Sequence, residues 1–282
     1  MRVNFLRKPS MPLLGLQLYT EAKVIVLGIP YDSGQTYQTG SRFFPFFIRL
    51  CSDSIEEYSF FFEKDVRECD ASDWGDVEVS FGDFEETSRR VEHVINKLGD
   101  KKFVFLGGDH SITIMTVSVL RKNIRRYVHL DAHSDFEDSY LGSKFNHDTV
   151  LRRVGEILGW DKITLLGVRS ISKKAHHDLK ELGVEFYTSI EIKDDPDILR
   201  DFLKKADYIS LDMDFFDPSI APEVGNPEPM GLKAEDLILT IKDWNNKYFD
   251  VVEGIPKNPG SITAILAATL LREIIIRMSC GS

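Results

Sequence analysis

The stretch of this sequence that most constrains the fold is YVHLDAHSD, residues 127–135. Its first four residues have strand-like character and end at Leu130. Asp131, His133 and Asp135 follow at every second position, and alternate side chains of an extended segment point the same way. The stretch therefore predicts a strand whose carboxyl end presents two carboxylates and an imidazole to one spot.

Two other stretches repeat this design. The sequence FVFLGGDH runs from an apolar strand into a turn that ends at His110, and YISLDMD ends in Asp212 and Asp214. A single aspartate after a strand is commonly a turn residue or a helix cap. Capping does not explain three strands that end in six metal-type ligands, which are His110, Asp131, His133, Asp135, Asp212 and Asp214.

Hydrophobic periodicity predicts strands that alternate with helices along the chain. The expected strands are 23–28, 68–71, 102–106, 126–130, 163–166, 185–187, 208–211 and 250–252. The expected helices are 43–58, 84–98, 111–120, 148–158, 173–182, 197–205, 234–246 and 262–278. This alternation predicts a three-layer, doubly wound α/β fold with a mostly parallel sheet and helices on both faces. No repeat or composition break marks a linker, so we expect a single domain over residues 1–282.

Open parallel sheets bind ligands beyond the carboxyl ends of their strands. The six candidate ligands lie just past predicted strand ends, and so does Glu253, which follows the last strand. The architecture should gather these residues at one edge of the sheet. The loop 131–147 is long for an α/β connection, and such loops are often functional.

Composition narrows the class of partner and the compartment. A net charge of −10 argues against nucleic acid and favours cationic small molecules or metals. Three scattered cysteines fit reduced thiols in a cytoplasmic protein. There is no convincing signal peptide, and charged residues interrupt the apolar run 262–278, so we expect a buried helix there and no membrane span.

The candidate ligands are two histidines and four aspartates. Such an oxygen-rich set suits Mn²⁺, although Zn²⁺, Fe²⁺ or Co²⁺ are also compatible with it. Six side chains are too many for one tetrahedral zinc but suit two cations about 3.5–4 Å apart. Four aspartates also balance the charge of two divalent ions. Water bridging such a pair ionises near neutral pH, so the set predicts metal-assisted hydrolysis.

The sequence resembles the arginase/agmatinase (ureohydrolase) superfamily from about residue 24 to the C-terminus. The resemblance rests on GGDHS (107–111), DAHSD (131–135) and SLDMDFFDP (210–218). Supporting matches are GIPYD (28–32), GSR (40–42) with IR (48–49), DWGD (73–76) and VE (252–253).

The resemblance implies an arginase-like fold and two Mn²⁺ per chain. By this resemblance, Asp131 and Asp212 bridge both metals. His110 and Asp135 complete the sphere of one metal, and His133 and Asp214 that of the other. It further implies that a bridging hydroxide attacks a guanidinium carbon and releases urea, and that the protein is a homo-oligomer, a trimer or a hexamer.

Two more roles follow from the same resemblance. His147 occupies the place of a loop histidine that shuttles protons, and Glu253 that of the carboxylate that holds the guanidinium. The chain departs from the family pattern at Asp148, where glycine is usual, and at PEVGNP (222–227), where PGTGTP is usual. These departures bear on which substrate is bound.

We expect the substrate to be a small guanidino cation, agmatine, which would be converted to urea and putrescine in polyamine biosynthesis. Arginine, guanidinobutyrate and formiminoglutamate are the alternatives within the family, and a non-catalytic paralogue that binds metal or a polyamine is another. Arginases of the family commonly carry an asparagine that binds the substrate α-carboxylate where this chain has Glu137. Glu137 and Asp148 should repel that carboxylate and attract the distal ammonium of agmatine, unless Lys144 points inward and offsets them.

Overall fold

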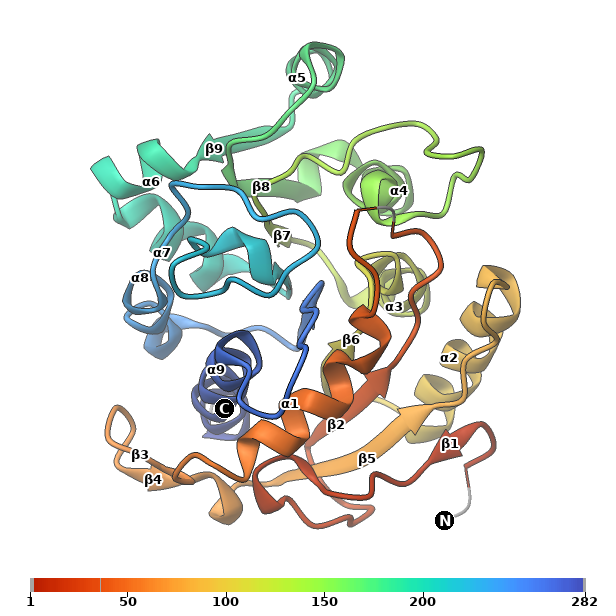
Figure 1. The fold of residues 1–282 in the computed structure, drawn as a ribbon, viewed down its shortest axis with the longest axis vertical. Coiled ribbons are helices and arrows are strands. Elements are labelled where there is room, and N and C mark those ends of the chain that lie inside the picture. Colours follow the sequence, from red (N-terminus) through yellow and green to blue (C-terminus); the bar gives the residue numbers. More distant parts are fainter. Residues whose placement is uncertain (1–2, 36, 281–282) are drawn as a thin grey trace.

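The computed structural model describes residues 3–35 and 37–280, which are built around one large twisted sheet (Figure 1). Its strand order is β1-β5-β2-β6-β11-β10-β7-β8-β9, and all neighbours run parallel except β1 and β5. The strands are β1 (Leu6–Arg7), β2 (Val24–Ile29), β5 (Ala71–Val77), β6 (Lys102–Gly107), β7 (Tyr127–Leu130), β8 (Ile163–Val168), β9 (Glu185–Thr188), β10 (Tyr208–Asp212) and β11 (Tyr248–Val252). A separate hairpin pairs β3 (Tyr58–Ser59) with β4 (Lys64–Asp65).

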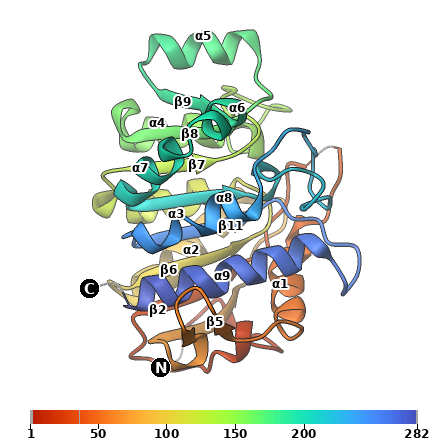
Figure 2. The same cartoon turned by 90° about the vertical axis from the view of Figure 1, so that its left-hand side faces the viewer.

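Helices cover both faces of the sheet, as the sequence predicted (Figures 1 and 2). One face carries α1 (Phe44–Ser52), α6 (Ser189–Asp194), α7 (Asp197–Lys205), α8 (Ala234–Ile238) and α9 (Ile262–Cys280). The other carries α2 (Phe84–Leu98), α3 (Ile112–Leu120), α4 (Val150–Leu158) and α5 (Lys173–Glu181). The three-layer α/β architecture is therefore confirmed.

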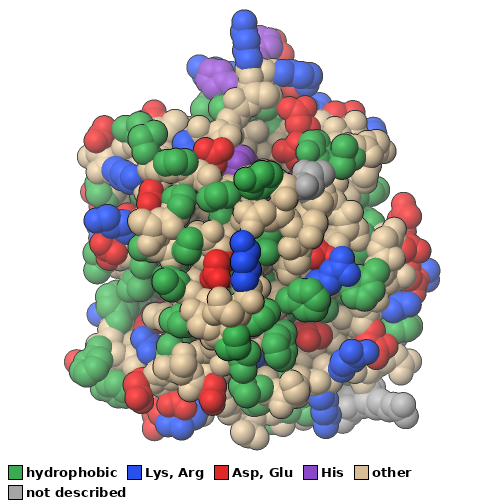
Figure 3. All heavy atoms as spheres, viewed as in Figure 1, with side chains coloured by type: hydrophobic (Ala, Val, Ile, Leu, Met, Phe, Trp, Pro, Cys, Tyr) green, Lys and Arg blue, Asp and Glu red, His purple; other side chains and the backbone are tan. Residues whose placement is uncertain are grey.

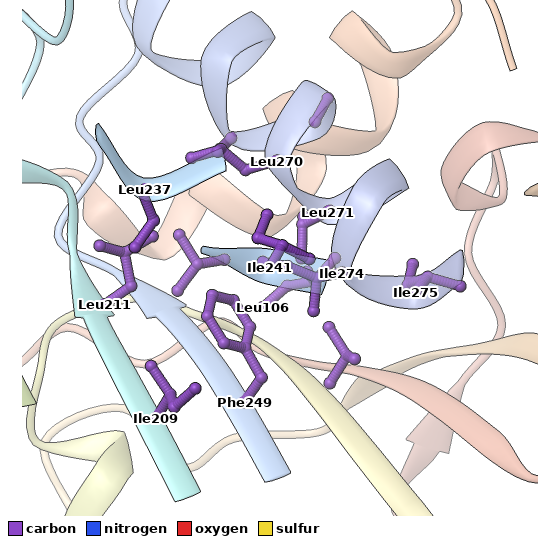
Figure 4. Close-up of a cluster of buried hydrophobic side chains, with 14 of the residues drawn as sticks. Leu106, Ile209, Leu211, Leu237, Ile241, Phe249, Leu270, Leu271, Ile274 and Ile275 are labelled. Carbon is purple, nitrogen blue, oxygen red and sulfur yellow. The ribbon is translucent and has the colours of Figure 1, made fainter. Parts of the chain in front are cut away.

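Helix α9 forms the centre of one core. Leu270, Leu271 and Ile274 are at most 1% exposed and face the strands that carry Leu106 and Phe249 (Figure 4). Burying each such side chain contributes about 1.5–3 kcal/mol. The apolar C-terminal run is thus a buried helix, as expected. No helix in the described part of the chain has the length and apolar character that crossing a bilayer requires.

The central strands end at the same level of the sheet. Pairing places four apolar residues side by side near the carboxyl ends of the strands, and these are Leu106, Val251, Leu211 and Leu130. The residues that follow them in the chain therefore emerge along one edge. In Figure 2 this edge lies on the right, where the loops that follow the strands gather.

Three predicted elements differ from the structure. The strand predicted over 68–71 is displaced. β5 begins at Ala71 and includes residues 73–76, where Asp73 and Asp76 both pair with the buried guanidinium of Arg49 at 2.8 and 2.6 Å. The helix predicted over 43–58 ends at Ser52, whose hydroxyl donates to the carbonyl of Arg49. The helix predicted over 234–246 stops at Ile238.

The end of α8 has a local cause. The Thr240 hydroxyl donates to the carbonyl of Leu237 and accepts from the indole of Trp244, so it competes with the helical ladder. A short 3₁₀ turn, Ile241–Asp243, follows. Helix α6 was not predicted, although Thr188 and Glu191 form a capping box whose spacing is visible in the sequence.

Candidate metal centre and active site

The six candidate ligands meet at the carboxyl edge of the sheet. They come from the ends of three strands, with His110 after β6, three residues after β7 and two at the end of β10. All six are buried except His133, which is about one-fifth exposed in its side chain. The structure therefore brings together residues that the sequence spreads over more than a third of the chain.

One group of contacts surrounds His110. Its Nδ1 lies 3.2 Å from Asp131 Oδ2, 3.2 Å from Asp135 Oδ2 and 3.3 Å from Asp212 Oδ2. The Nε2 of the same ring lies 2.9 Å from Ser210 Oγ, which turns Nδ1 toward the three carboxylates. One nitrogen and three carboxylate oxygens thus converge on a single point.

A second group of contacts surrounds His133. Its Nδ1 lies 2.8 Å from Asp214 Oδ2 and 3.6 Å from Asp131 Oδ1. Asp131 therefore faces the first group through Oδ2 and the second through Oδ1. This is the arrangement that a carboxylate bridging two cations requires.

The backbone holds these carboxylates in place. Asp212 Oδ1 accepts the amide N–H of Asp214 at 2.8 Å, and Asp214 Oδ1 accepts that of Ala132 at 3.0 Å. Asp135 has φ 46°, a left-handed conformation that is uncommon for a residue other than glycine. Such strain persists only where the surroundings enforce it and is frequent at functional sites.

The cluster fits a pair of cations. His110 Nδ1 and Asp131 Oδ2 are both buried without a hydrogen-bond partner, although they face each other. Burial, followed by repulsion from Asp131, raises the pKa of Asp135 to about 8. Unpartnered buried donors and crowded carboxylates are unfavourable unless cations neutralise them. The residues could hold metal in two adjoining groups, one containing His110, Asp131 and Asp135 and the other Asp131, His133 and Asp214.

A cavity of about 110 Å³ opens beside the cluster. Its lining includes four of the six candidate ligands together with three other residues predicted to be functional, His147, Asp148 and Glu253. The remaining lining residues are Gln35, Tyr37, Gln38, Tyr140, Gly225 and Asn226. Among the described residues the lining contains acidic, neutral polar and aromatic side chains but neither lysine nor arginine. In the space-filling view of the same face, acidic side chains lie near a visible histidine (Figure 3).

Glu253 is fixed at the cavity wall by three contacts. Its N–H donates to the carbonyl of Gly108 at 2.9 Å, Oε1 accepts the amide of His110 at 2.6 Å, and Oε2 accepts Gln35 Nε2 at 2.5 Å. Its φ of 66° is again left-handed. Burial, and then repulsion from Asp109, raises the pKa of Glu253 to about 8. A cation entering the cavity would therefore stabilise the ionised form.

His147 and Asp148 lie on another wall, in the 3₁₀ turn His147–Thr149 that precedes α4. The ring of His147 packs edge-on against Tyr140, with 5.5 Å between centroids, and its Nδ1 is buried without a hydrogen-bond partner. Burial lowers the pKa of His147 to about 4, so its imidazole is neutral at pH 7. Burial, and then repulsion from Glu137, raises the pKa of Asp148 to about 6.

Glu137 is placed differently from the expectation. It is not among the cavity-lining residues, and its carboxylate accepts the Ser172 hydroxyl at 3.0 Å. Its amide donates to the carbonyl of Asp148 at 3.1 Å, and the negative charge of its side chain contributes to the raised pKa of Asp148. Lys144, which the sequence left as a possible offset, is exposed and is also not among the lining residues.

Comparison with known proteins places this geometry in a family. Residues 22–276 match the family model described as the arginase family. The chain belongs to the arginase family. It is 34% identical over 264 residues to an agmatinase of Pyrococcus horikoshii, covering 90% of this chain and 92% of that protein. It is 32% identical over 262 residues to the N(1)-aminopropylagmatine ureohydrolase of Thermococcus kodakarensis, covering 89% of each.

Solved structures of the family agree. The agmatine ureohydrolase of Thermoplasma volcanium superposes with a TM-score of 0.87 at 36% identity, covering 96% of this chain and 95% of that one. The resemblance to the arginase family drawn from the sequence motifs is therefore confirmed, together with the fold that it implied.

One residue of this arginase-family cluster was not predicted from the sequence. His129 is fully buried, stacks on His110 with 4.4 Å between ring centroids, and places Nε2 3.1 Å from Asp131 Oδ2. Its Nδ1 lies 2.7 Å from the hydroxyl of Tyr127. The signal was present, because His129 precedes Asp131 by two residues and so shares the side of the strand from which the ligands project.

A network of buried polar side chains also supports the ligand cluster through its contact with His110. Ser210, which contacts His110, donates its hydroxyl to Asp250 Oδ1 at 2.6 Å. The other oxygen of Asp250 accepts the hydroxyls of Tyr208 and Thr113 at 2.6 and 2.8 Å. Metal-binding histidines typically use their second nitrogen in such contacts, which fix the ring orientation.

Proposed function

We propose that this protein hydrolyses agmatine to urea and putrescine with two Mn²⁺ bound per chain. It is an agmatinase-like amidinohydrolase, a hydrolase that acts on the C–N bonds of linear amidines. One observation supports the proposal above all others. Asp131 points one oxygen at His110 and the other at His133, and the cluster that it joins borders an acidic cavity lined by Asp135, Asp212, Asp214 and Glu253.

The six candidate ligands would be shared between the two cations. His110, Asp131, Asp135 and Asp212 would hold one cation, and Asp131, His133, Asp212 and Asp214 the other. When bound, the pair supplies an activated water for hydrolysis. Manganese fits because the donors are mainly carboxylate oxygens with two imidazoles and no thiolate.

Glu253 would orient the substrate. Each of its oxygens already accepts one hydrogen bond, which leaves lone pairs free to accept from a guanidinium fork. His147 would move the proton. Its neutral imidazole lines the cavity with an unpartnered Nδ1, so it can take up a proton and pass it to the leaving amine.

The outer cavity favours a cationic tail. Asp148 faces the cavity, and Glu137 adds charge behind it. Among the described lining residues there is no cation to receive the α-carboxylate of arginine. Two carboxylates facing each other at about 4 Å would repel by on the order of 1–4 kcal/mol, depending on solvent exposure. Agmatine is therefore preferred over arginine.

A urea-release screen with added Mn²⁺ tests the proposal. The urea-release substrates are agmatine, N(1)-aminopropylagmatine, arginine and guanidinobutyrate. Formiminoglutamate is followed by formamide release, because hydrolysis of its formimino group cannot yield urea. We expect agmatine to give the highest kcat/KM. Metal analysis of the same sample separates the alternatives. Two ions per chain with neither urea nor formamide from any substrate would indicate a non-catalytic paralogue, and faster arginine hydrolysis would indicate an arginase.

The proposal extends to location and assembly. Cys51 is a buried free cysteine, which suits a cytoplasmic protein. The family resemblance supports one catalytic domain that assembles into trimers or hexamers. Light scattering on the purified protein would measure the assembly, and a monomer at micromolar concentration would contradict that part of the proposal.

A further inference from the structure

Arg169 follows strand β8, and its half-buried guanidinium faces backbone carbonyls. All three of its nitrogens donate. Their acceptors, at distances of 2.6 to 3.4 Å, are the carbonyl oxygens of Gly167, Asp214, Phe215, Phe216, Glu228 and Pro229. A planar fork with five N–H groups can serve such a set, whereas a lysine ammonium offers three donors at a single point.

These acceptors belong to two functional segments. Asp214 and Phe215 end the 3₁₀ turn Met213–Phe215, which carries the candidate ligand Asp214, and Phe216 follows it. The last carbonyls of a helical turn have no partner within it, and a cation there satisfies them. Glu228 and Pro229 belong to residues 217–231, which we call the substrate-side loop.

The substrate-side loop borders the cavity. Its base is closed where the N–H of Asp217 donates to the carbonyl of Leu232 at 2.9 Å, and its middle, Gly225 and Asn226, lines the cavity. The carbonyl of Glu223 accepts the N–H of Ile255, just after Glu253, at 2.7 Å. In Figure 1 the loop is the blue excursion between β10 and α8, in front of the sheet.

Arg169 is also hydrogen-bonded to residues 131–135, the segment after β7 that carries three candidate ligands. Its N–H donates to the carbonyl of Ala132 at 2.9 Å, and the N–H of Ala132 donates to Asp214 Oδ1 at 3.0 Å. Gly167, with φ 96°, allows the end of β8 to pack closely against Phe215, because a Cβ there would lie 2.6 Å from the ring of Phe215. Arg169 therefore connects residues 131–135, the 3₁₀ turn that carries Asp214, and the substrate-side loop.

We propose that Arg169 is a positioning residue that locks the substrate-side loop to the metal-ligand turn and thereby sets substrate affinity. Its link to affinity rests on the proposed function, whereas its link to the loop does not. The loop contains the PEVGNP sequence by which this chain departs from its family, so the same contact would hold a chain-specific surface against a shared centre.

The test compares Arg169→Lys, which keeps the charge but loses the fork, with Arg169→Ala. Arg200→Lys on α7, which alters an exposed ion pair with Asp197, is the matched control. We measure amide hydrogen exchange across the chain, bound metal, and kinetics with agmatine. In Arg169→Lys we expect exchange in residues 217–231 to accelerate about tenfold and KM to rise about tenfold, with kcat changed less and two ions retained.

Unchanged exchange in residues 217–231 in both Arg169 variants would overturn the proposal. Acceleration spread over the whole sheet would also overturn it, because that result describes a general structural role. So would loss of metal with an unaltered loop. If the wild-type enzyme releases no urea from agmatine, the proposed function fails, while hydrogen exchange still decides whether Arg169 holds the loop.

Discussion

Gln35 Nε2 lies 2.5 Å from Glu253 Oε2, although 218 residues separate the two in sequence. The contact joins the loop after β2 to the end of β11 and turns the carboxylate toward the cavity. Glu253→Gln should lower kcat/KM for agmatine about 10- to 100-fold, because a hydrogen bond to a charged group contributes about 1.5–3 kcal/mol. Gln35→Ala should have a smaller effect, mainly on KM. Wild-type kcat/KM in Glu253→Gln, measured by urea release, would exclude guanidinium binding by this residue.

Asp131→Asn should remove at least one of the two cations. Asp131 contributes one oxygen to each histidine group, and an amide cannot supply two anionic ligand atoms. Plasma emission spectrometry after dialysis measures the stoichiometry. Asp138→Asn, at a side chain that is 56% exposed, is the control and should retain two ions. One ion per chain in fully active wild-type protein would contradict the binuclear site.

His147→Asn should reduce kcat about 10²- to 10⁴-fold while leaving metal content intact, since general acid–base catalysis typically contributes that factor. Because burial holds the pKa of His147 near 4, the neutral imidazole is present at pH 7 and is lost only as the pH falls through about 4. Added imidazole should restore part of the rate. An unchanged rate would make His147 a wall residue without a proton-transfer role.

Asp148→Asn should stabilise the metal-free protein at alkaline but not at acidic pH. The folded pKa of Asp148, about 6, lies above its ordinary value of 3.8. Its neutral form is therefore favoured in the folded state, and the associated stability, present below about pH 4, is lost as the pH rises through 6. The variant should have a higher Tm than wild type at pH 8 and an equal Tm at pH 4. An equal Tm at both values would mean that Asp148 is well solvated.

Substrate preference should depend more on Asp148 than on Glu137. Asp148 lines the cavity, whereas Glu137 acts from behind it. Asp148→Asn should narrow the kcat/KM ratio of agmatine to arginine more than Glu137→Asn does. A larger effect from Glu137→Asn would show that Glu137 turns into the cavity when substrate binds.

The fold was predictable because its signals are local. Buried strands such as Lys102–Gly107 are continuous apolar runs, and Asp83 and Gly99 mark the ends of α2. The strand predicted over 68–71 missed most of β5, because Asp73 and Asp76 are of a residue type common in loops and their buried partner is Arg49. That partner is distant in sequence, so local pattern could not reveal it.

The candidate site shows the same limit. Residues at alternate positions after a strand were found, because extended backbone alone brings them together. The contribution of Gln35 to Glu253 was not found, since it depends on how two loops meet in space. The orientation of Glu137 toward Ser172 was also invisible, because the side chain had two possible sides to occupy.

The order of the strands has a consequence for how the protein forms during synthesis. β11 is the last strand in the chain, yet it lies between β6 and β10 near the middle of the sheet. Until the ribosome has released residues 248–252, the two halves of the sheet have no strand between them, and each presents an unpaired edge. Glu253 arrives with the same strand. The nascent chain therefore cannot complete the cavity before β11 has been synthesised. A truncation that removes β11 should leave two aggregation-prone half-sheets rather than a folded enzyme of lower activity.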